Sequence, residues 1–206
     1  PDYALHEPNR GMTLSRNQLV LDFSRKEVVD NIYNQMCLIL DKVPLDYIKW
    51  DFNRNLTEVF SSAADAEHQG EVSHRYVLGL YDLMERLVTR YPNILFEGCS
   101  GGGGRFDAGI LYYMPQSWPS DDTDAVERLK IQYGTSLTYP ISSMTAHVSV
   151  SPNQQTGRST SFEMRGDVAM SGVFGYELDL ADLTEEDRQM VKEQIKFYKA
   201  HRHLIQ

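Results

Sequence analysis

The segment YIKWDFNRN, residues 47–55, carries a carboxylate in surroundings where it could do chemistry. Asp51 ends a short apolar run, with Lys49 and Asn53 two residues to either side. Residues two apart share one face of an extended strand, so we expect these three side chains to point the same way. A nearby cation and amide keep a carboxylate ionised, as a nucleophile must be. An Asp at a strand end can equally cap the next helix, and Asp51 alone leaves both roles open.

A second group of carboxylates stands in WPSDDTD, residues 118–124, between a strand-like run and a predicted helix. Asp121, Asp122 and Asp124 could form an acidic first turn that satisfies the free amides and the dipole of that helix. Trp118 stands in the same loop, and an exposed aromatic ring beside carboxylates is typical of a sugar-binding platform. Two carboxylates that face one cleft from separate strand ends are the minimum apparatus for glycoside hydrolysis.

The glycine run in CSGGGGRFD, residues 99–107, is a weak nucleotide signal. It lacks the Lys-Ser/Thr of a P-loop and the Gly-x-Gly-x-x-Gly spacing of a dinucleotide site. It is either a flexible loop or backbone that approaches a ligand closely or adopts positive φ. His147, inside a β-like run, is interpreted as a core histidine, and Arg16 as a cation of a surface loop.

Composition and charge bound the class of protein. With 206 residues, 41% hydrophobic and 24% charged, the chain can bury a sizeable core, and no linker suggests a domain boundary. The 20 basic and 29 acidic residues give −9, which argues against nucleic-acid and anionic-membrane partners and favours a neutral substrate. Cys37 and Cys99 suggest neither a disulfide framework nor a zinc site, so we expect a cytoplasmic protein. The opening at Pro1, without a signal pattern, suggests a start inside a larger protein.

Strand-like runs alternate with amphipathic helical segments along the whole chain. The predicted strands are residues 18–23, 45–52, 93–99, 110–118, 142–150 and 173–180. The predicted helices are one after Ser24 as N-cap, one with an apolar stripe over 77–88, one over about 123–133, and one over 183–202 with Thr184 and Asp187 as a capping box. This alternation predicts a parallel α/β sheet. Periodicity does not separate a barrel from a doubly wound sheet, but polar residues after several different strand ends favour a barrel.

Three motifs together resemble one family closely. YIKWDFNR, EGCSGGGGRFD and WPSDDTDAVERLKIQYGTS are similar to motifs of glycoside hydrolase family 36, the bacterial retaining α-galactosidases. RNQLVLD, MTAHVS and ELDL also look like that family, in the same order, so the resemblance covers essentially the whole chain. A related α-glucosidase family has Trp-x-Asp-Met-Asn-Glu at the first motif. Lys49 before Trp50, and Arg54 in the place of Glu, favour the galactosidases.

The resemblance implies a (β/α)₈ TIM-type barrel that removes terminal α-galactosyl residues from oligosaccharides of the melibiose and raffinose type. Asp51 looks like the nucleophile that forms a covalent galactosyl intermediate, and Asp121 like the general acid and then the base. The two carboxyl groups of a retaining enzyme lie about 5 to 5.5 Å apart. No metal or organic cofactor is implied. The residues that match sugar-binding positions are Lys49, Asn53, Arg16, Cys99 and Gly102, and Trp118 is added from its place in the loop.

The departures from the family pattern leave some alternatives open. Asp122 stands where Asn is common, so the assignment of Asp121 over Asp122 as acid is open. Phe52 stands where Met is usual and should affect packing more than chemistry. Residues 1–206 match barrel strands three to eight, so we expect a partial catalytic domain, without the family's N-terminal sandwich, first two strands and C-terminal domain. The alternatives are an α-N-acetylgalactosaminidase, an α-galactosyl transferase, or an inactive fragment that only binds sugar. The parent is expected to be a homo-oligomer.

Overall fold

A computed structural model describes residues 2–205, and the chain divides into two compact units, Pro1–Phe96 and Glu97–Gln206. The first unit contains α1 (Lys26–Leu40), β1 (Tyr47–Asp51), the 3₁₀ helix η1 (Gln69–Glu71) and α2 (Val72–Arg90). The strand β2 (Leu95–Cys99) crosses from the first unit into the second. The second unit continues with α3 (Ala108–Tyr113), β3 (Gln116–Ser117), α4 (Ala125–Ser136), η2 (Ile141–Ser143), β4 (Thr145–Ser149), α5 (Phe162–Ala169), β5 (Val173–Glu177), η3 (Leu180–Asp182) and α6 (Glu185–Ile205).

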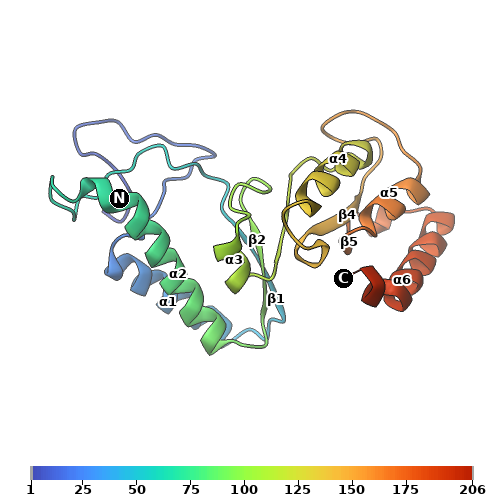
Figure 1. The fold of residues 1–206 in the computed structure, drawn as a ribbon, viewed down its shortest axis with the longest axis horizontal. Coiled ribbons are helices and arrows are strands. Elements are labelled where there is room, and N and C mark those ends of the chain that lie inside the picture. Colours follow the sequence, from blue (N-terminus) through green and yellow to red (C-terminus); the bar gives the residue numbers. More distant parts are fainter. Residues whose placement is uncertain (1, 206) are drawn as a thin grey trace. The chain divides into compact units, whose positions relative to one another are not determined.

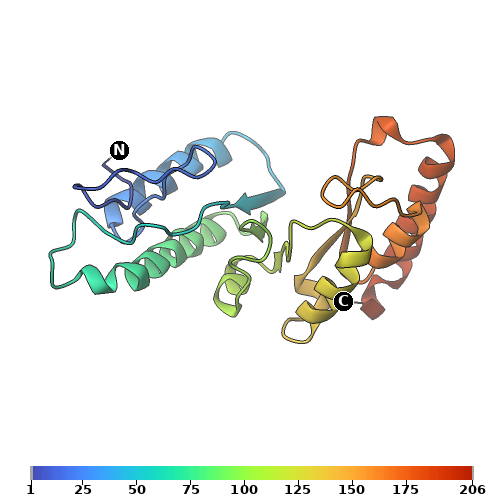
Figure 2. The same cartoon turned by 90° about the horizontal axis from the view of Figure 1, so that it is seen from above.

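In the first unit, α1 and α2 lie side by side (Figures 1 and 2). Their apolar faces bury Val28 and Val29 against Leu83 and Leu87, all 2% exposed or less. Gly79 of α2 lies against the carbonyl of Phe23, since a Cβ there would stand 1.8 Å from the oxygen. The paired helices α1 and α2 therefore contribute buried apolar residues to the core of the first unit.

The buried stripe of α2 differs from the predicted one by a fraction of a turn. The sequence predicted that Val77 belongs to it, but Val77 is 38% exposed, while Val72 and Tyr76 are buried. The helix also begins earlier than the stripe, at Val72. The ring of Tyr76 stacks on Phe23 at 5.6 Å between centroids, and this contact rotates the buried face.

The predicted strand 18–23 is wrong as a strand. The segment has only two isolated antiparallel bridges, one between Ala4 and Leu21 and one between Ser15 and Gln18. Asp22 is fully buried, and its carboxylate accepts hydrogen bonds from the hydroxyls of Ser24 and Ser61, so the chain turns inward here. The Ser24 hydroxyl is used in its bond to Asp22, and Ser24 is not the N-cap of α1. Arg25 takes the N-cap position, and its side chain makes no capping hydrogen bond.

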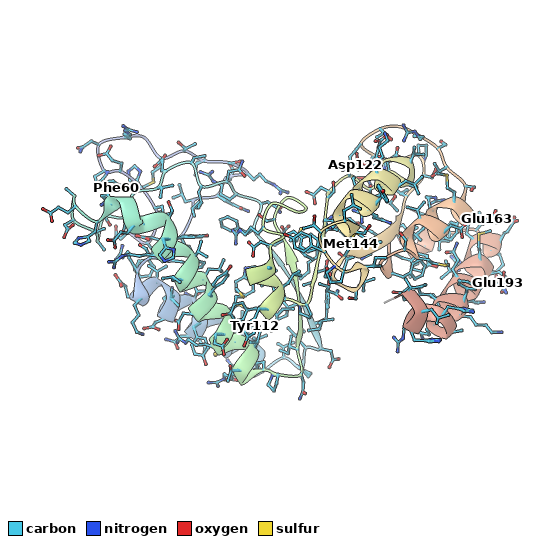
Figure 3. The ribbon with its side chains drawn as sticks, in the orientation of Figure 1. Phe60, Tyr112, Asp122, Met144, Glu163 and Glu193 are labelled. Atoms are coloured by element: carbon cyan, nitrogen blue, oxygen red, sulfur yellow. The ribbon has the colours of Figure 1, made fainter. Side chains whose placement is uncertain are left out.

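In the second unit the strands follow one another in sequence order. β2 pairs in parallel with β3, and β4 pairs in parallel with β5 (Figure 1). A single parallel bridge between Ser117 and Met144 continues the order from β3 to β4. Met144, which directly precedes β4 and is labelled in Figure 3, is 1% exposed. Parallel strands that neighbour one another in sequence order are typical of a barrel, whereas a doubly wound sheet reverses its order.

The predicted strand 110–118 is mostly a helix. The Asp107 carboxylate accepts the N–H of Ile110 at 2.8 Å and caps α3, which leaves only the two residues of β3 as strand. The sequence reading also missed α5, which Ser161 caps by accepting the N–H of Met164 at 3.1 Å. The other predicted strands and helices are present, with ends shifted by a few residues.

The helix α6 begins at the predicted capping box. The Asp187 N–H donates to the Thr184 hydroxyl at 3.1 Å, and the Thr184 N–H donates back to the Asp187 carboxylate at 3.3 Å. Even α6 has too many charged side chains to cross a membrane, and no other helix of residues 2–205 combines the length and apolar character that a span needs.

Candidate active site

Asp51 is exposed at the carboxyl end of β1. Lys49 and Asp51 lie on the exposed side of this strand, whereas Ile48 and Trp50 are half-buried. The side-chain amide of Asn53 donates to Oδ2 of Asp51. The predicted shared face is therefore confirmed, and the helix-cap reading of Asp51 is wrong, because residues 52–60 form no helix. A carboxylate with one oxygen oriented by an amide is positioned to attack or bind a ligand.

Arg16 projects from a tight turn in the same unit. Ser15 and Gln18 exchange backbone hydrogen bonds across the turn, at 3.4 and 3.0 Å. Between them Arg16 and Asn17 have φ of 53° and 58°, a left-handed pair that matches a type I′ turn. Such backbone is uncommon for arginine and recurs at functional sites. The side chain of Arg16 is exposed, as the sequence predicted.

Sequence reasoning missed the anchor of this turn, Arg54, which is 5% exposed. Its guanidinium donates to the carbonyls of Gln18 at 3.1 Å and Asn55 at 2.7 Å, and also to the carbonyl of Thr13. A further bond reaches the Thr57 hydroxyl at 3.1 Å. Arg54 thus joins the turn to the segment that follows β1. The one sign of this anchor in the sequence was that Arg54 follows closely after Asp51. Arginine is usually exposed, so composition alone would place Arg54 on the surface.

In the second unit the glycine loop is closely packed backbone. Gly101 and Gly102 have φ of 56° and 82°, which confirms the expected positive φ. A Cβ on Gly102 would lie 2.6 Å from Cα of Ser120 and 2.7 Å from the amide nitrogen of Asp121. The glycines therefore let this loop lie directly against the backbone of the carboxylate loop. Cys99, at the end of β2, is 8% exposed.

The three carboxylates of residues 118–124 have different environments. Asp124 is buried and caps α4, accepting the N–H of Val126 at 2.8 Å. Asp122 accepts the N–H of Asp124 at 3.0 Å, so the helix-start reading holds for these two residues. Asp121 is exposed, and within the described part of the second unit its carboxylate has no hydrogen bond. Asp121 is therefore the carboxylate left available to a ligand.

The expectation of an exposed ring at Trp118 is wrong, because the residue is 3% exposed. Its backbone N–H donates to the carbonyl of Gly98 at 2.8 Å, which continues the pairing of β2 and β3. The His147 ring stacks on the indole at 4.7 Å, and the Arg128 guanidinium lies 4.4 Å from it. With its ring covered by two neighbours, Trp118 supports the loop instead of offering a platform.

Arg128 is bonded to the loop of residues 118–124 that carries the three carboxylates. It is 2% exposed and donates to the carbonyls of Ser120 at 3.1 Å and Thr145 at 2.8 Å, and to Oε1 of Gln132 at 3.0 Å. Burial lowers the pKa of Arg128 to about 10, with Asp122 opposing the shift, so the guanidinium keeps its charge at neutral pH. Its attraction to the Trp118 ring adds to these bonds.

No group of three or more His, Cys, Asp or Glu side chains among residues 2–205 is arranged to hold a metal ion. The chemistry that the exposed side chains offer is that of carboxylates. Asp51 ends β1, Cys99 ends β2, and Asp121 follows β3. In α/β barrels, active-site residues stand at the carboxyl ends of the strands.

These features define an α/β protein with exposed carboxylates at or just beyond strand ends, and comparison gives its family. The melibiase family model matches residues 1–206, and the chain belongs to the melibiase family. It is 62% identical over 206 residues to an α-galactosidase from Pediococcus pentosaceus, which covers all of this chain and 28% of that protein.

Two solved structures are similar over the whole chain. One is a GH36 α-galactosidase AgaA variant from Geobacillus stearothermophilus in complex with raffinose, with 59% identity and a TM-score of 0.98. The other is an AgaA variant from the same organism in complex with stachyose, with the same identity and TM-score. Each match covers 100% of this chain and 29% of the other. The chain thus spans less than a third of these relatives, and its partly present barrel belongs to the GH36 fold.

Proposed function

We propose that the protein containing this chain is a retaining α-galactosidase that acts on raffinose-type oligosaccharides. The observation that carries this proposal is about 60% identity across all 206 residues to α-galactosidases, one of which, AgaA, is solved as variants with raffinose and with stachyose. The exposed carboxylates of Asp51 and Asp121 at strand ends supply the two groups that the reaction needs.

In the proposed reaction the Asp51 carboxylate attacks the anomeric carbon, and the bond to the leaving-group oxygen breaks. Asp121 gives its proton to that oxygen, so the aglycone leaves as a neutral alcohol. Asp121, now ionised, takes a proton from water, which attacks the galactosyl ester and releases Asp51. Two displacements at one carbon give galactose with the original α configuration.

The residues that match the family's sugar-binding positions are proposed to bind the galactosyl unit. In the first unit Lys49, Asn53 and Arg16 provide a cation, an amide and a guanidinium. In the second, Cys99 and Gly102 provide a thiol and closely approaching backbone. We assign the strands β1 to β5 to strands four to eight of the (β/α)₈ barrel, and the segment 18–23, which forms only isolated bridges here, to the position of strand three.

The test is made in the full-length protein with an aryl α-galactoside and with raffinose. The unaltered protein should cleave both and release α-galactose first, as followed by proton NMR. Asp51→Ala should lose turnover by at least about 10⁴-fold, as enzymes do when a covalent nucleophile is removed. Asp65→Ala, an exposed carboxylate paired with His68, is the control and should stay near normal. Near-normal turnover in Asp51→Ala would refute the nucleophile assignment.

A further inference from the structure

The turn formed by residues 153–158 is built around one buried side chain. Asn153 is 5% exposed, and its Oδ1 accepts the N–H groups of Gln155 at 2.9 Å and Thr156 at 3.0 Å. Its own carbonyl accepts the N–H of Gly157 at 2.9 Å, where φ is +70°. Because these bonds lie within the turn, it keeps one shape and presents its side chains in fixed directions.

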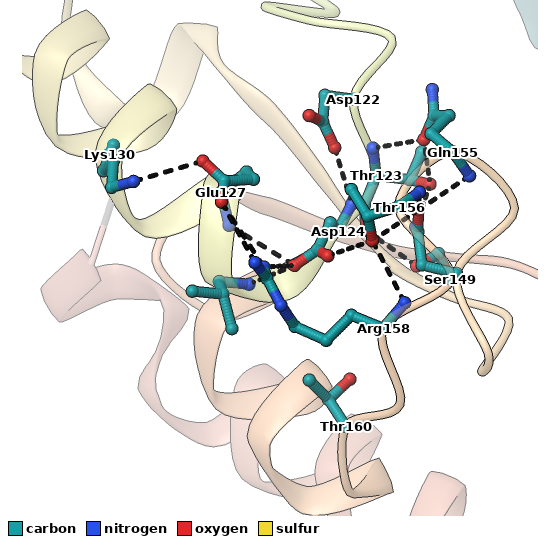
Figure 4. A network of polar contacts seen from close by, with 12 residues as sticks. Asp122, Thr123, Asp124, Glu127, Lys130, Ser149, Gln155, Thr156, Arg158 and Thr160 are labelled. Atoms are coloured by element: carbon teal, nitrogen blue, oxygen red, sulfur yellow. Dashed lines mark hydrogen bonds and ion pairs between the residues drawn. The ribbon is translucent and has the colours of Figure 1, made fainter.

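This turn is bonded to the loop that carries Asp121 (Figure 4). Oε1 of Gln155 accepts both the N–H and the hydroxyl of Thr123, each at 3.0 Å. Nε2 of Gln155 donates to the backbone carbonyl of Asp121. The Thr123 hydroxyl also accepts from Asn153 at 2.9 Å, and the Thr123 carbonyl accepts from the Ser149 hydroxyl at 2.8 Å. The backbone on both sides of Asp122 is therefore fixed by one amide side chain.

A second attachment of the turn lies one residue further along. The buried carboxylate of Asp124 accepts from the Thr156 hydroxyl and, at 2.7 Å, from the Arg158 guanidinium, which also approaches Glu127 at 3.4 Å (Figure 4). Burial raises the pKa of Asp124, but these bonds and the Val126 N–H outweigh it and lower the pKa. Asp124 therefore stays ionised, and the start of α4 stays attached to the turn.

On its other side the same loop meets Arg128, which donates to the Ser120 carbonyl, and the backbone of Gly102. The backbone of residues 120–124 is thus held from both sides, while the carboxylate of Asp121 stays exposed. A group that transfers a proton needs this combination, because a small displacement of the acid relative to the leaving oxygen lowers the rate steeply.

We propose that Gln155 is a positioning residue for proton transfer by Asp121. In this role Gln155 does not contact the substrate. Its side-chain amide accepts from Thr123 and donates to the Asp121 carbonyl, and these bonds set the direction in which the Asp121 side chain leaves the backbone. The inference rests on the proposed function, with Asp121 as acid and base. The alternative is that the turn stabilises the fold and has no role in proton transfer.

The test uses the full-length protein and a series of aryl α-galactosides whose leaving groups range from good to poor. Good leaving groups depart without a proton, whereas poor ones need the acid. Gln155→Ala should therefore keep kcat/KM within about 2-fold for substrates with good leaving groups and lower it about 10-fold for substrates with poor ones. The loss is a part of the roughly 10²- to 10⁴-fold that acid catalysis contributes. A purely structural role would lower kcat/KM equally for every substrate, because it reduces only the amount of active protein.

Two further variants keep the result decisive. Gln189→Ala removes an exposed glutamine of α6 that bonds Glu193, and it should leave the whole series unchanged. Gln155→Glu keeps the acceptor for Thr123 but loses the donor to the Asp121 carbonyl. It should also steepen the dependence on the leaving group, even if Gln155→Ala fails to fold.

The outcomes separate this proposal from the one on which it rests. A uniform loss, or none, in both Gln155 variants overturns the positioning role while the unaltered protein remains an α-galactosidase. If the unaltered protein cleaves no α-galactoside, the proposed function fails and the role of Gln155 fails with it. If Asp121→Ala itself shows no added dependence on the leaving group, Asp121 is not the acid, and the role of Gln155 is again overturned.

Discussion

The guanidinium of Arg54 donates to the carbonyl of Gln18 at 3.1 Å, joining the turn of Arg16 to the segment that follows Asp51. Two stretches of chain some thirty-five residues apart are thereby held together by one buried cation. Its partners are neutral oxygens of the backbone and one hydroxyl. An arginine is suited to this because its planar group offers five donors in a fixed arrangement.

Replacing Arg54 should therefore weaken both stability and substrate binding. Arg54→Met leaves buried carbonyls without donors, at a cost of about 2 to 4 kcal/mol in the free energy of unfolding. The released turn no longer fixes Arg16, so KM should rise. Urea unfolding and steady-state kinetics measure the two effects. Arg10→Met, an exposed arginine paired with Glu7, is the control and should change neither. Normal stability in Arg54→Met would contradict the anchoring role.

The sequence predicted the local arrangement of Lys49 and Asp51 better than some of the elements around them. The shared face of Lys49 and Asp51 follows from strand alternation, which is a local property, and the structure has it. The helix α3 could not be foreseen, because Ile110 to Tyr113 are apolar and aromatic residues that suit a strand equally well, and a cap at Asp107 decides between them. The burial of Trp118 depends on Arg128 and His147, which are distant in sequence. Contacts of that kind have no local signature.

The different bonding of Asp121 and Asp122 predicts which of them is the acid. Asp122→Asn keeps an oxygen that can accept the N–H of Asp124, so kcat/KM should stay within about 3-fold on every substrate, as with most changes that preserve a bond. Asp121→Ala should lose about 10²- to 10⁴-fold on raffinose and much less on an activated aryl galactoside. The measurement is kcat/KM for both substrates. The opposite pattern would assign the acid to Asp122.

Gly102 should not tolerate a side chain, because its φ is +82° and a Cβ would meet the backbone of Ser120 and Asp121. The positive φ alone costs an alanine about 1 to 3 kcal/mol. Displacement of the Asp121 backbone should also lower kcat/KM on poor leaving groups by about 10-fold or more. Gly134→Ala is the matched control, since nothing lies within 4 Å of its Cβ and the residue is inside α4. That variant should gain up to about 1 kcal/mol, as measured by thermal unfolding.

The attachment of Glu58 to Thr13 and His6 should make the first unit sensitive to acid. The Thr13 N–H donates to Glu58 at 3.0 Å and His6 Nδ1 lies 3.1 Å from it, and bonds from these two residues lower the pKa of Glu58 from 4.5 to about 2. Because the folded-state pKa is the lower one, the carboxylate stabilises the fold above its unfolded pKa of 4.5, and this stabilisation is lost as the pH falls toward 2.

The comparison with Glu58→Gln isolates this effect, because the amide keeps an acceptor oxygen but carries no charge. The urea midpoint of the unaltered protein should exceed that of the variant by a constant amount above about pH 5, where the carboxyl is ionised in both the folded and unfolded states. Between pH 4.5 and about 2 the difference should shrink. A difference that stays constant to about pH 2 would show that the charge of Glu58 contributes nothing to the stability of the fold.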